Sequence, residues 1–289
     1  MSGLSFLIEV DLDYYREMHK DLKKHTDEEL IAHYFQHGYF EGRISQFYSL
    51  RENFIKQFLG MSCLEIGPFV NPSLTHPTVK YLDVLSTQEL ICRANLFGFS
   101  TEKIREIDYV SPDGSLEIIR EKFDVVFSSH NLEHQPDLIG HLQEVGSILE
   151  DSGRFAMIVP NARYCFDADL PLSKISDIFN AYVSQRKKHT LGSVIEHRAL
   201  TTHNDALFHW NNSNRREYKP IDVGKIRDAI IEFDQACGGY IDVHAWQFDP
   251  LSLADILNVL IKLKYIPFQR VTCYGPVFGR NEFTLELLK

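Results

Sequence analysis

The stretch MSCLEIGPFVNP at positions 61–72 decides the fold class of this chain of 289 residues. Residues 61–66 form a short apolar run that Gly67 and Pro68 close, as expected for a buried parallel strand. Further strand-like runs lie at 80–84, 104–110, 123–128 and, after a turn at 151–153, at 154–159. Segments with helical spacing separate them at 87–97 and 136–149. Strands that alternate with helices form βαβ units, so we predict a parallel sheet with right-handed crossovers.

Helical segments are expected before and after these units in the sequence. Residues 12–43 and 44–59 have apolar side chains at helical spacing, so residues 1–60 are predicted to be an N-terminal helical segment. Within the main domain, residues 61–289, a helix-containing insertion at 160–245 follows the fifth strand, covers the sheet edge and faces the substrate. A helix at 251–263 and a hairpin of strands at 266–274 and 282–288 close the chain. The predicted fold is α/β and Rossmann-like, with a doubly wound, mostly parallel sheet and an antiparallel final strand.

Composition and charge narrow the function classes. The hydrophobic share of 44% and the charged share of 24% are those of a soluble globular protein, and no apolar run is long enough to span a bilayer. The net charge of −10 disfavours binding to nucleic acid or to an anionic membrane surface. Five dispersed cysteines without a CxxC pair indicate free thiols. We expect a cytoplasmic protein that does not insert into a membrane. The sequence is also compatible with a homodimer.

Ligands of open α/β sheets bind at the carboxyl ends of the strands, so the residues after each strand are the candidate site. The loop after the first strand contains one glycine, Gly67, where a dinucleotide fingerprint has three, which disfavours an NAD-dependent oxidoreductase. Asp83 ends the second strand, where a carboxylate can bind both ribose hydroxyls. Taken alone, the Gly67 loop also fits a plain turn and Asp83 a helix cap.

Several motifs together carry a family resemblance. They are LEIGP at 64–68, YLDV at 81–84, FDVVFSSH at 123–130, LEH at 132–134 and GRFAMIVPN at 153–161. On these motifs the chain resembles the class I S-adenosylmethionine-dependent methyltransferases, especially bacterial members with a LEIGP-type first motif. The resemblance covers about residues 61–167 and the closing strand at 281–283.

The resemblance implies S-adenosylmethionine as the cofactor and a role for each motif. Glu65 and the Gly67 backbone would bind the methionine end, and Asp83 the ribose. Asp108 and Tyr109 would face the adenine, and residues 128–130 would line the floor near the sulfonium. The expected cofactor contacts are Glu65, Gly67, Pro68, Asn71, Asp83, Val84, Asp108, Tyr109, Ser128, Ser129 and His130.

Histidines are the candidates for a general base, which a hydroxyl acceptor requires. We select His134, His197 and His203, the last two from a dense polar segment of the insertion. Residues 130–134 also match the H-x-x-E-H pattern of zinc peptidases. That pattern needs both histidines on one helical face, whereas His130 is expected at a strand exit. We therefore assign no metal ligands, and a magnesium ion that aids deprotonation stays an alternative.

The N-terminal segment suggests an acceptor. DYY at 13–15 and HYFQHGYFEGR at 33–43 are similar to a short helical module attached to bacterial enzymes of surface-polysaccharide biosynthesis. That similarity implies a methyltransferase that O-methylates a sugar or glycan. The alternatives are N- or O-methylation of another small metabolite, and a non-catalytic cofactor-binding scaffold in polysaccharide assembly.

Overall fold

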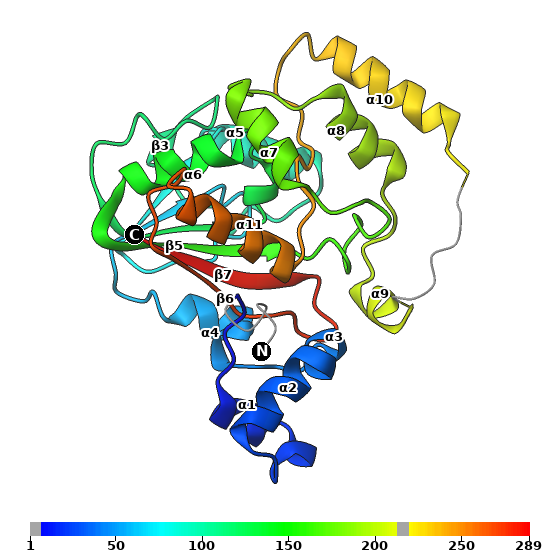
Figure 1. The fold of residues 1–289 in the computed structure, drawn as a ribbon. Helices are drawn as coiled ribbons and strands as arrows, with labels where there is room; N and C mark the ends of the chain where they lie inside the picture. The colour runs from blue at the N-terminus through cyan, green and yellow to red at the C-terminus, as the bar shows by residue number, and fades with distance from the viewer. Residues whose placement is uncertain (1–6, 213–219) are drawn as a thin grey trace.

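A seven-stranded sheet forms the centre of the structure, a computed structural model that describes residues 7–212 and 220–289 (Figure 1). The order of strands across the sheet is β3-β2-β1-β4-β5-β7-β6. The strands are β1 (Cys63–Ile66), β2 (Val79–Asp83), β3 (Tyr109–Val110), β4 (Phe123–Ser129), β5 (Leu149–Pro160), β6 (Arg270–Cys273) and β7 (Glu282–Leu288). Residues 1–6 and 213–219, which fall in the predicted N-terminal segment and insertion, lie outside the described residues.

Strand β1 is the switch point of the sheet, because the order of strands reverses there. It pairs in parallel with β2 on one side and with β4 on the other, and β4 pairs in parallel with β5. Strand β7 runs antiparallel to both β5 and β6. These pairings confirm the predicted α/β, Rossmann-like fold with a mostly parallel sheet and an antiparallel final strand.

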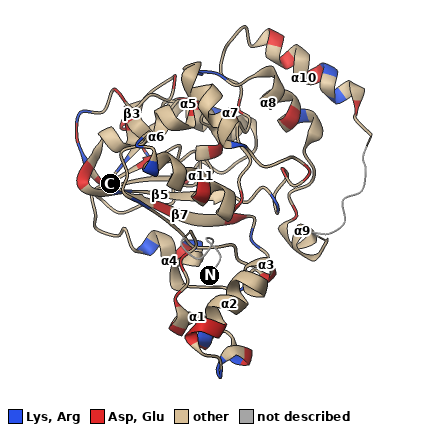
Figure 2. Ribbon diagram, viewed as in Figure 1, with Lys and Arg blue, Asp and Glu red and all other residues tan. Residues whose placement is uncertain are grey.

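Helices cover both faces of the sheet. Those before the insertion are α1 (Leu12–Met18), α2 (Asp27–His33), α3 (Tyr39–Glu41), α4 (Arg51–Lys56), α5 (Thr87–Leu96) and α6 (Leu138–Ser147). The later ones are α7 (Ile175–Val183), α8 (Leu191–Ile195), α9 (Ala206–Asn212), α10 (Val223–Gln235) and α11 (Pro250–Lys262). Among the described residues, no helix has both the length and the apolar character that crossing a bilayer demands. Acidic and basic residues are interspersed along α10 (Figure 2).

Alternating side chains of β4 show how the two faces are filled. Val126 belongs to the large buried cluster that also contains side chains of α6, α7 and α11, which lie over one face of the sheet (Figure 1). Val125 and Phe127 point the other way and pack with Phe54 of α4 and with Phe58. Because successive side chains of a strand point to opposite faces, an apolar run such as FDVVFS fits a strand buried on both sides.

The N-terminal segment packs against the β6–β7 hairpin. Ile8 forms a parallel bridge with Cys273 of β6, and the carbonyl of Gly42 accepts a hydrogen bond of 2.9 Å from the Phe278 amide. Gly42 has φ of +65°, and a Cβ there would lie 2.4 Å from the Phe278 nitrogen, so a glycine is needed at this close approach. Tyr15 and Tyr34 belong to the same buried cluster as the sheet, so the segment shares the core of the main domain.

The insertion forms a small layer of its own beside the sheet. Helices α8 and α10 lie side by side (Figure 1), and their contact buries Val194 and Ala229. Arg198 reinforces the contact by donating two hydrogen bonds of 2.9 Å to the Glu232 carboxylate. The chain then returns to the sheet, where the Ala245 amide donates to the Glu133 carbonyl at 2.7 Å. This return brings residues 240–244 to the carboxyl end of β4.

Three predicted elements differ from the structure. The single helix predicted at 44–59 is wrong, because Gln46 and Leu50 have extended backbones that leave a 3₁₀ turn (Phe47–Ser49) and the short α4. The predicted third strand shrinks to the two residues of β3. The predicted turn at 151–153 is part of β5, where the Gly153 carbonyl accepts the Lys289 amide at 2.9 Å.

Candidate active site

A cavity of about 270 Å³ opens at the carboxyl ends of β1, β2 and β4. Its wall combines residues from the loop after β1, the end of β2, helix α5, the loop after β3, the segment after β4 and the end of the insertion. The lining residues that are polar, or that are glycines exposing their backbone, are Gly67, Asp83, Arg93, Asp113, Gly114, His130, Asn131, His134, Gln135, Lys187, Tyr240 and Asp242. The cavity therefore lies where the sequence predicted the site, at the switch point of the sheet.

Gly67 shapes the cavity wall next to β1. Its φ is +68°, and a Cβ there would lie 2.9 Å from the Asn131 side-chain nitrogen. The Gly67 amide donates to the Leu82 carbonyl at 2.8 Å, which fixes the loop against β2. A glycine here would let the backbone approach a ligand closely.

Asp83 contributes a buried carboxylate to the cavity. It is 7% exposed, and its Oδ1 accepts a hydrogen bond of 3.0 Å from the Leu85 amide. Burial raises the pKa of the Asp83 carboxyl, and hydrogen bonds from the Leu85, Val84 and Phe69 backbone oppose the rise. Val84 also lines the cavity, so both predicted residues at the end of β2 are placed at the site.

Glu65 lies beside the cavity but does not line it. Its two carboxylate oxygens accept the backbone amides of Ser73 and Leu74 at 2.8 and 2.9 Å, and the side chain is 2% exposed. The carboxylate thus fixes the loop that connects β1 to β2. Burial raises the pKa of Glu65 to about 7, although the two amides and Arg51 act in the opposite direction.

This raised pKa predicts a pH-dependent stability. The folded chain retains the Glu65 proton where the unfolded chain loses it, so the Glu65 contribution is full below pH 4.5 and is lost as the pH rises to about 7. The free energy of unfolding of the native chain, relative to that of Glu65→Gln, should therefore fall by up to roughly 3 kcal/mol between pH 4.5 and 7.5. Urea unfolding at both pH values measures it. A difference that does not change with pH would mean that Glu65 is ionised when folded.

Other predicted cofactor contacts lie outside the cavity wall. Asp108 accepts the Tyr81 amide at 2.8 Å, and the Tyr109 hydroxyl contacts Glu121 and Lys80. Asn71 is exposed and accepts a hydrogen bond of 3.2 Å from Lys103, while Pro68 is buried behind the loop. After β3, Asp113 and Gly114 line the cavity in place of Asp108 and Tyr109.

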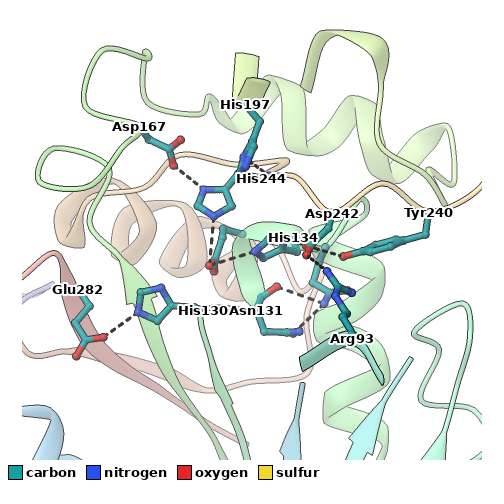
Figure 3. A network of polar contacts seen from close by, with 12 residues as sticks. Arg93, His130, Asn131, His134, Asp167, His197, Tyr240, Asp242, His244 and Glu282 are labelled. Atoms are coloured by element: carbon teal, nitrogen blue, oxygen red, sulfur yellow. Dashed lines mark hydrogen bonds and ion pairs between the residues drawn. The ribbon is translucent and has the colours of Figure 1, made fainter. Parts of the chain in front are cut away.

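At the end of β4, His130 lines the cavity, whereas Ser128 and Ser129 do not. His130 has φ of +51°, and its Nε2 lies 2.8 Å from Oε2 of Glu282, a residue of β7 (Figure 3). Burial raises the pKa of Glu282, but the His130 hydrogen bond and the Arg51 charge bring it below the usual value. Ser128 is buried with its hydroxyl unpartnered among the described residues, and Ser129 pairs with Ile158 in the sheet.

Of the three base candidates, His134 and His197 each contact His244, whereas His203 contacts His209. His134 lines the cavity, and its Nδ1 is 3.2 Å from Oδ1 of Asp242 (Figure 3). His197 accepts the His244 amide at 3.1 Å, and burial lowers the pKa of His197 to about 4. His203 is exposed and stacks on His209 with ring centroids 4.3 Å apart.

Several site residues, among them Arg93, Tyr240 and Asp242, were missed from the sequence, whereas His244 is one of the histidines that the sequence offers as a candidate base. Arg93 of α5 pairs with Asp242 at 2.7 Å, and Tyr240 lies 3.3 Å from the same carboxylate. His244 follows on the same returning segment and contacts Asp167. No local sequence pattern indicates that these residues belong to the site, because the returning segment reaches the cavity only when the insertion folds back. Lys187, which follows α7 in the insertion, also lines the cavity.

No family model and no curated protein matches the chain. Among solved structures, the chain is similar to the mitomycin 7-O-methyltransferase MmcR, with 10% identity, 96% of this chain and 60% of that chain covered, and a TM-score of 0.37. It is similar to a putative S-adenosylmethionine-dependent methyltransferase from Listeria monocytogenes, with 12% identity, 83% and 97% covered, and a TM-score of 0.37. The CMeT domain of citrinin polyketide synthase matches with 10% identity, 82% and 50% covered, and a TM-score of 0.39.

The chain spans about half the length of the first structures that it matches. At these identities the activity of this chain has to be argued from its own residues.

Proposed function

We propose that this chain is an S-adenosylmethionine-dependent methyltransferase whose cofactor binds in the cavity at the switch point. The observation that carries the proposal is the buried Asp83 carboxylate, which shares one cavity with Gly67 and His134. A carboxylate at the end of β2 suits the two ribose hydroxyls of an adenosine. The family resemblance of the sequence motifs points to the same cofactor.

The residues present fit a cofactor without phosphate groups. Residues 67–78, between β1 and β2, contain no helix, so the loop after β1 offers no helix N-terminus to a pyrophosphate. The cavity wall carries three carboxylates, Asp83, Asp113 and Asp242, which can accept hydrogen bonds from hydroxyl donors and face a cationic sulfonium, beside the cations Arg93 and Lys187. A volume of about 270 Å³ is close to the lower end of the range for small-molecule sites.

The bound cofactor would supply a methyl group activated on a cationic sulfur. The chain must then orient the acceptor for in-line attack and receive its proton. For a hydroxyl acceptor, an oxygen–carbon bond replaces the carbon–sulfur bond, and the hydroxyl proton must leave. We assign the acceptor side of the cavity to His134, because it is the one candidate base among the described residues that lines the cavity.

We further propose a sugar or glycan hydroxyl as the acceptor, on the similarity of the N-terminal segment to modules of polysaccharide enzymes. Polar side chains at the cavity, including Lys187 and Tyr240, suit an acceptor with several hydroxyls. A different small metabolite and a non-catalytic scaffold are the alternatives. A scaffold would bind the cofactor without transferring its methyl group.

Calorimetric titration of the chain with S-adenosylmethionine and with NAD tests the cofactor. We expect saturable binding of S-adenosylmethionine and much weaker binding of NAD, because the β1 loop does not accommodate a pyrophosphate. Transfer of a radiolabelled methyl group to a panel of sugars, glycans and small metabolites then tests catalysis. Tighter binding of NAD would overturn the proposal, and cofactor binding without transfer to any acceptor would favour the scaffold.

A further inference from the structure

Glu133 is a buried carboxylate without a hydrogen-bond partner. The residue follows β4, is 1% exposed, and neither of its carboxylate oxygens has a partner among the described residues. A buried carboxylate costs several kcal/mol unless it is paired or binds a metal. Its backbone is held firmly, since its carbonyl accepts the amides of Ala245 and Trp246 at 2.7 and 3.2 Å. The carboxylate therefore has a fixed place in the fold, where its contacts to two histidines are ion-pair distances and not hydrogen bonds.

Two imidazoles face this carboxylate. His134 Nε2 lies 3.7 Å and His244 Nε2 lies 3.8 Å from Oε1 of Glu133, and the three donor atoms all lie within 4.8 Å of one another. These separations are too long for hydrogen bonds. They are close to the spacing of about 3.4 Å that ligand atoms adopt around a tetrahedral ion with bonds of about 2.1 Å. Binding of an ion would have to draw the three atoms, which now lie within 4.8 Å of one another, closer together.

The opposite nitrogen of each ring lies beside a carboxylate. His244 Nδ1 lies 2.6 Å from Oδ2 of Asp167, which is 1% exposed, and His134 Nδ1 lies 3.2 Å from Oδ1 of Asp242 (Figure 3). The hydrogen bond to Asp167 fixes the His244 ring and leaves its Nε2 lone pair free, as in histidines that bind metals. His134 Nδ1 is in ion-pair range of Asp242 without a hydrogen bond, so its ring is oriented less firmly. Both Nε2 atoms of this pair are directed toward Glu133.

We propose that Glu133, His134 and His244 bind a divalent transition-metal ion at the edge of the cavity. Two imidazole nitrogens and one carboxylate are typical ligands of Zn²⁺ and its neighbours, whereas Mg²⁺ and Ca²⁺ prefer oxygen alone. Three protein ligands leave a coordination position open, as in catalytic zinc sites. Because His134 lines the cavity, a molecule bound there can approach this position.

The proposal changes how the sequence pattern at 130–134 is interpreted. The H-x-x-E-H match contains two of the ligands, but its first histidine is not the third. His130 directly follows strand β4, and its side chain contacts Glu282 and not the proposed ligands. The third ligand is His244, which the segment after the insertion returns to this point. A search of the local sequence could not pair residues from such distant segments.

The metal site does not depend on the proposed methyl transfer, because its ligands are complete without the cofactor. If both proposals hold, an acceptor hydroxyl would bind beside the ion, which would lower the pKa of that hydroxyl and assist loss of its proton. His134 would then bind the ion through Nε2 and would no longer take the proton itself, which would pass to water at the cavity. Cofactor binding by the metal-free chain, measured separately, distinguishes failure of one proposal from failure of the other.

Metal analysis of the full chain is the test. The chain is stripped with a chelator, reloaded with Zn²⁺ or Co²⁺, and freed of excess ion before its metal content and the visible absorption of bound Co²⁺ are measured. We expect about one ion per chain and an absorption band typical of low-coordinate Co²⁺. Glu133→Gln and His244→Ala should each lower the affinity by about tenfold or more, while His37→Ala, at an exposed histidine of the N-terminal segment, should match the native chain.

A second variant keeps the test decisive if a ligand variant does not fold. Asp167→Asn retains all three ligands and should lower the affinity by about 10- to 100-fold, because it weakens the contact that orients His244. Circular dichroism checks that each variant is folded. A folded native chain that retains no Zn²⁺ or Co²⁺ would overturn the proposal, as would folded Glu133→Gln and His244→Ala variants with native affinity.

Discussion

Asp83→Ala is expected to weaken binding of S-adenosylmethionine by about tenfold or more, which corresponds to about 1.4 kcal/mol. The Asp83 carboxylate is buried at the cavity, so its contacts to two ribose hydroxyls would be little screened by water. The substitution also removes the Oδ1 acceptor of the Leu85 amide, which loosens the start of the next loop. Calorimetric titration of both chains under the same conditions measures the change.

Two further variants separate a lost contact from a disturbed loop. Asp83→Asn retains the size and one oxygen acceptor, so its affinity should lie between those of the native chain and Asp83→Ala. Asp255→Ala removes an exposed carboxylate of α11 and should leave the affinity unchanged. Native affinity in a folded Asp83→Ala variant would remove Asp83 from the cofactor site.

The strands could be predicted where apolar runs are buried on both faces. Strands β1 and β4 follow directly from the runs at 61–66 and 123–128, and β7 has its predicted bounds. The helix predicted at 44–59 failed because its spacing is helical but its first residues pair with another segment. The Ser45 carbonyl accepts the Asp11 amide at 3.0 Å, a contact that no local pattern contains.

Like the fold, the candidate site contains some residues that the sequence could place and others that it could not. Gly67, Asp83 and His130 could be placed from the sequence, because the ends of parallel strands meet at one edge of the sheet. Asp108 could not be placed, because its side chain accepts the backbone amide of Tyr81, in the middle of β2, and does not line the cavity. Asp242 and His244 depend on the return of the insertion, which only tertiary packing determines.

His134→Ala is expected to abolish most methyl transfer while the chain still binds its cofactor. We expect turnover to fall by about 10²- to 10⁴-fold, because a hydroxyl acceptor loses the group that takes or directs its proton. Cofactor affinity should stay near the native value, since Asp83 and the Gly67 loop remain in place. Single-turnover transfer of a labelled methyl group, with affinity measured in parallel, checks both halves of the prediction.

The control is His37→Ala. This variant removes an exposed imidazole far from β4 in the sequence and should keep native turnover. Loss of cofactor binding together with turnover in His134→Ala would assign His134 to the cofactor instead of the acceptor. Native turnover would show that proton removal needs neither His134 nor an ion bound to it. Since Asp242 and Glu133 both contact His134, its loss should also change how these two carboxylates are arranged at the acceptor side of the cavity.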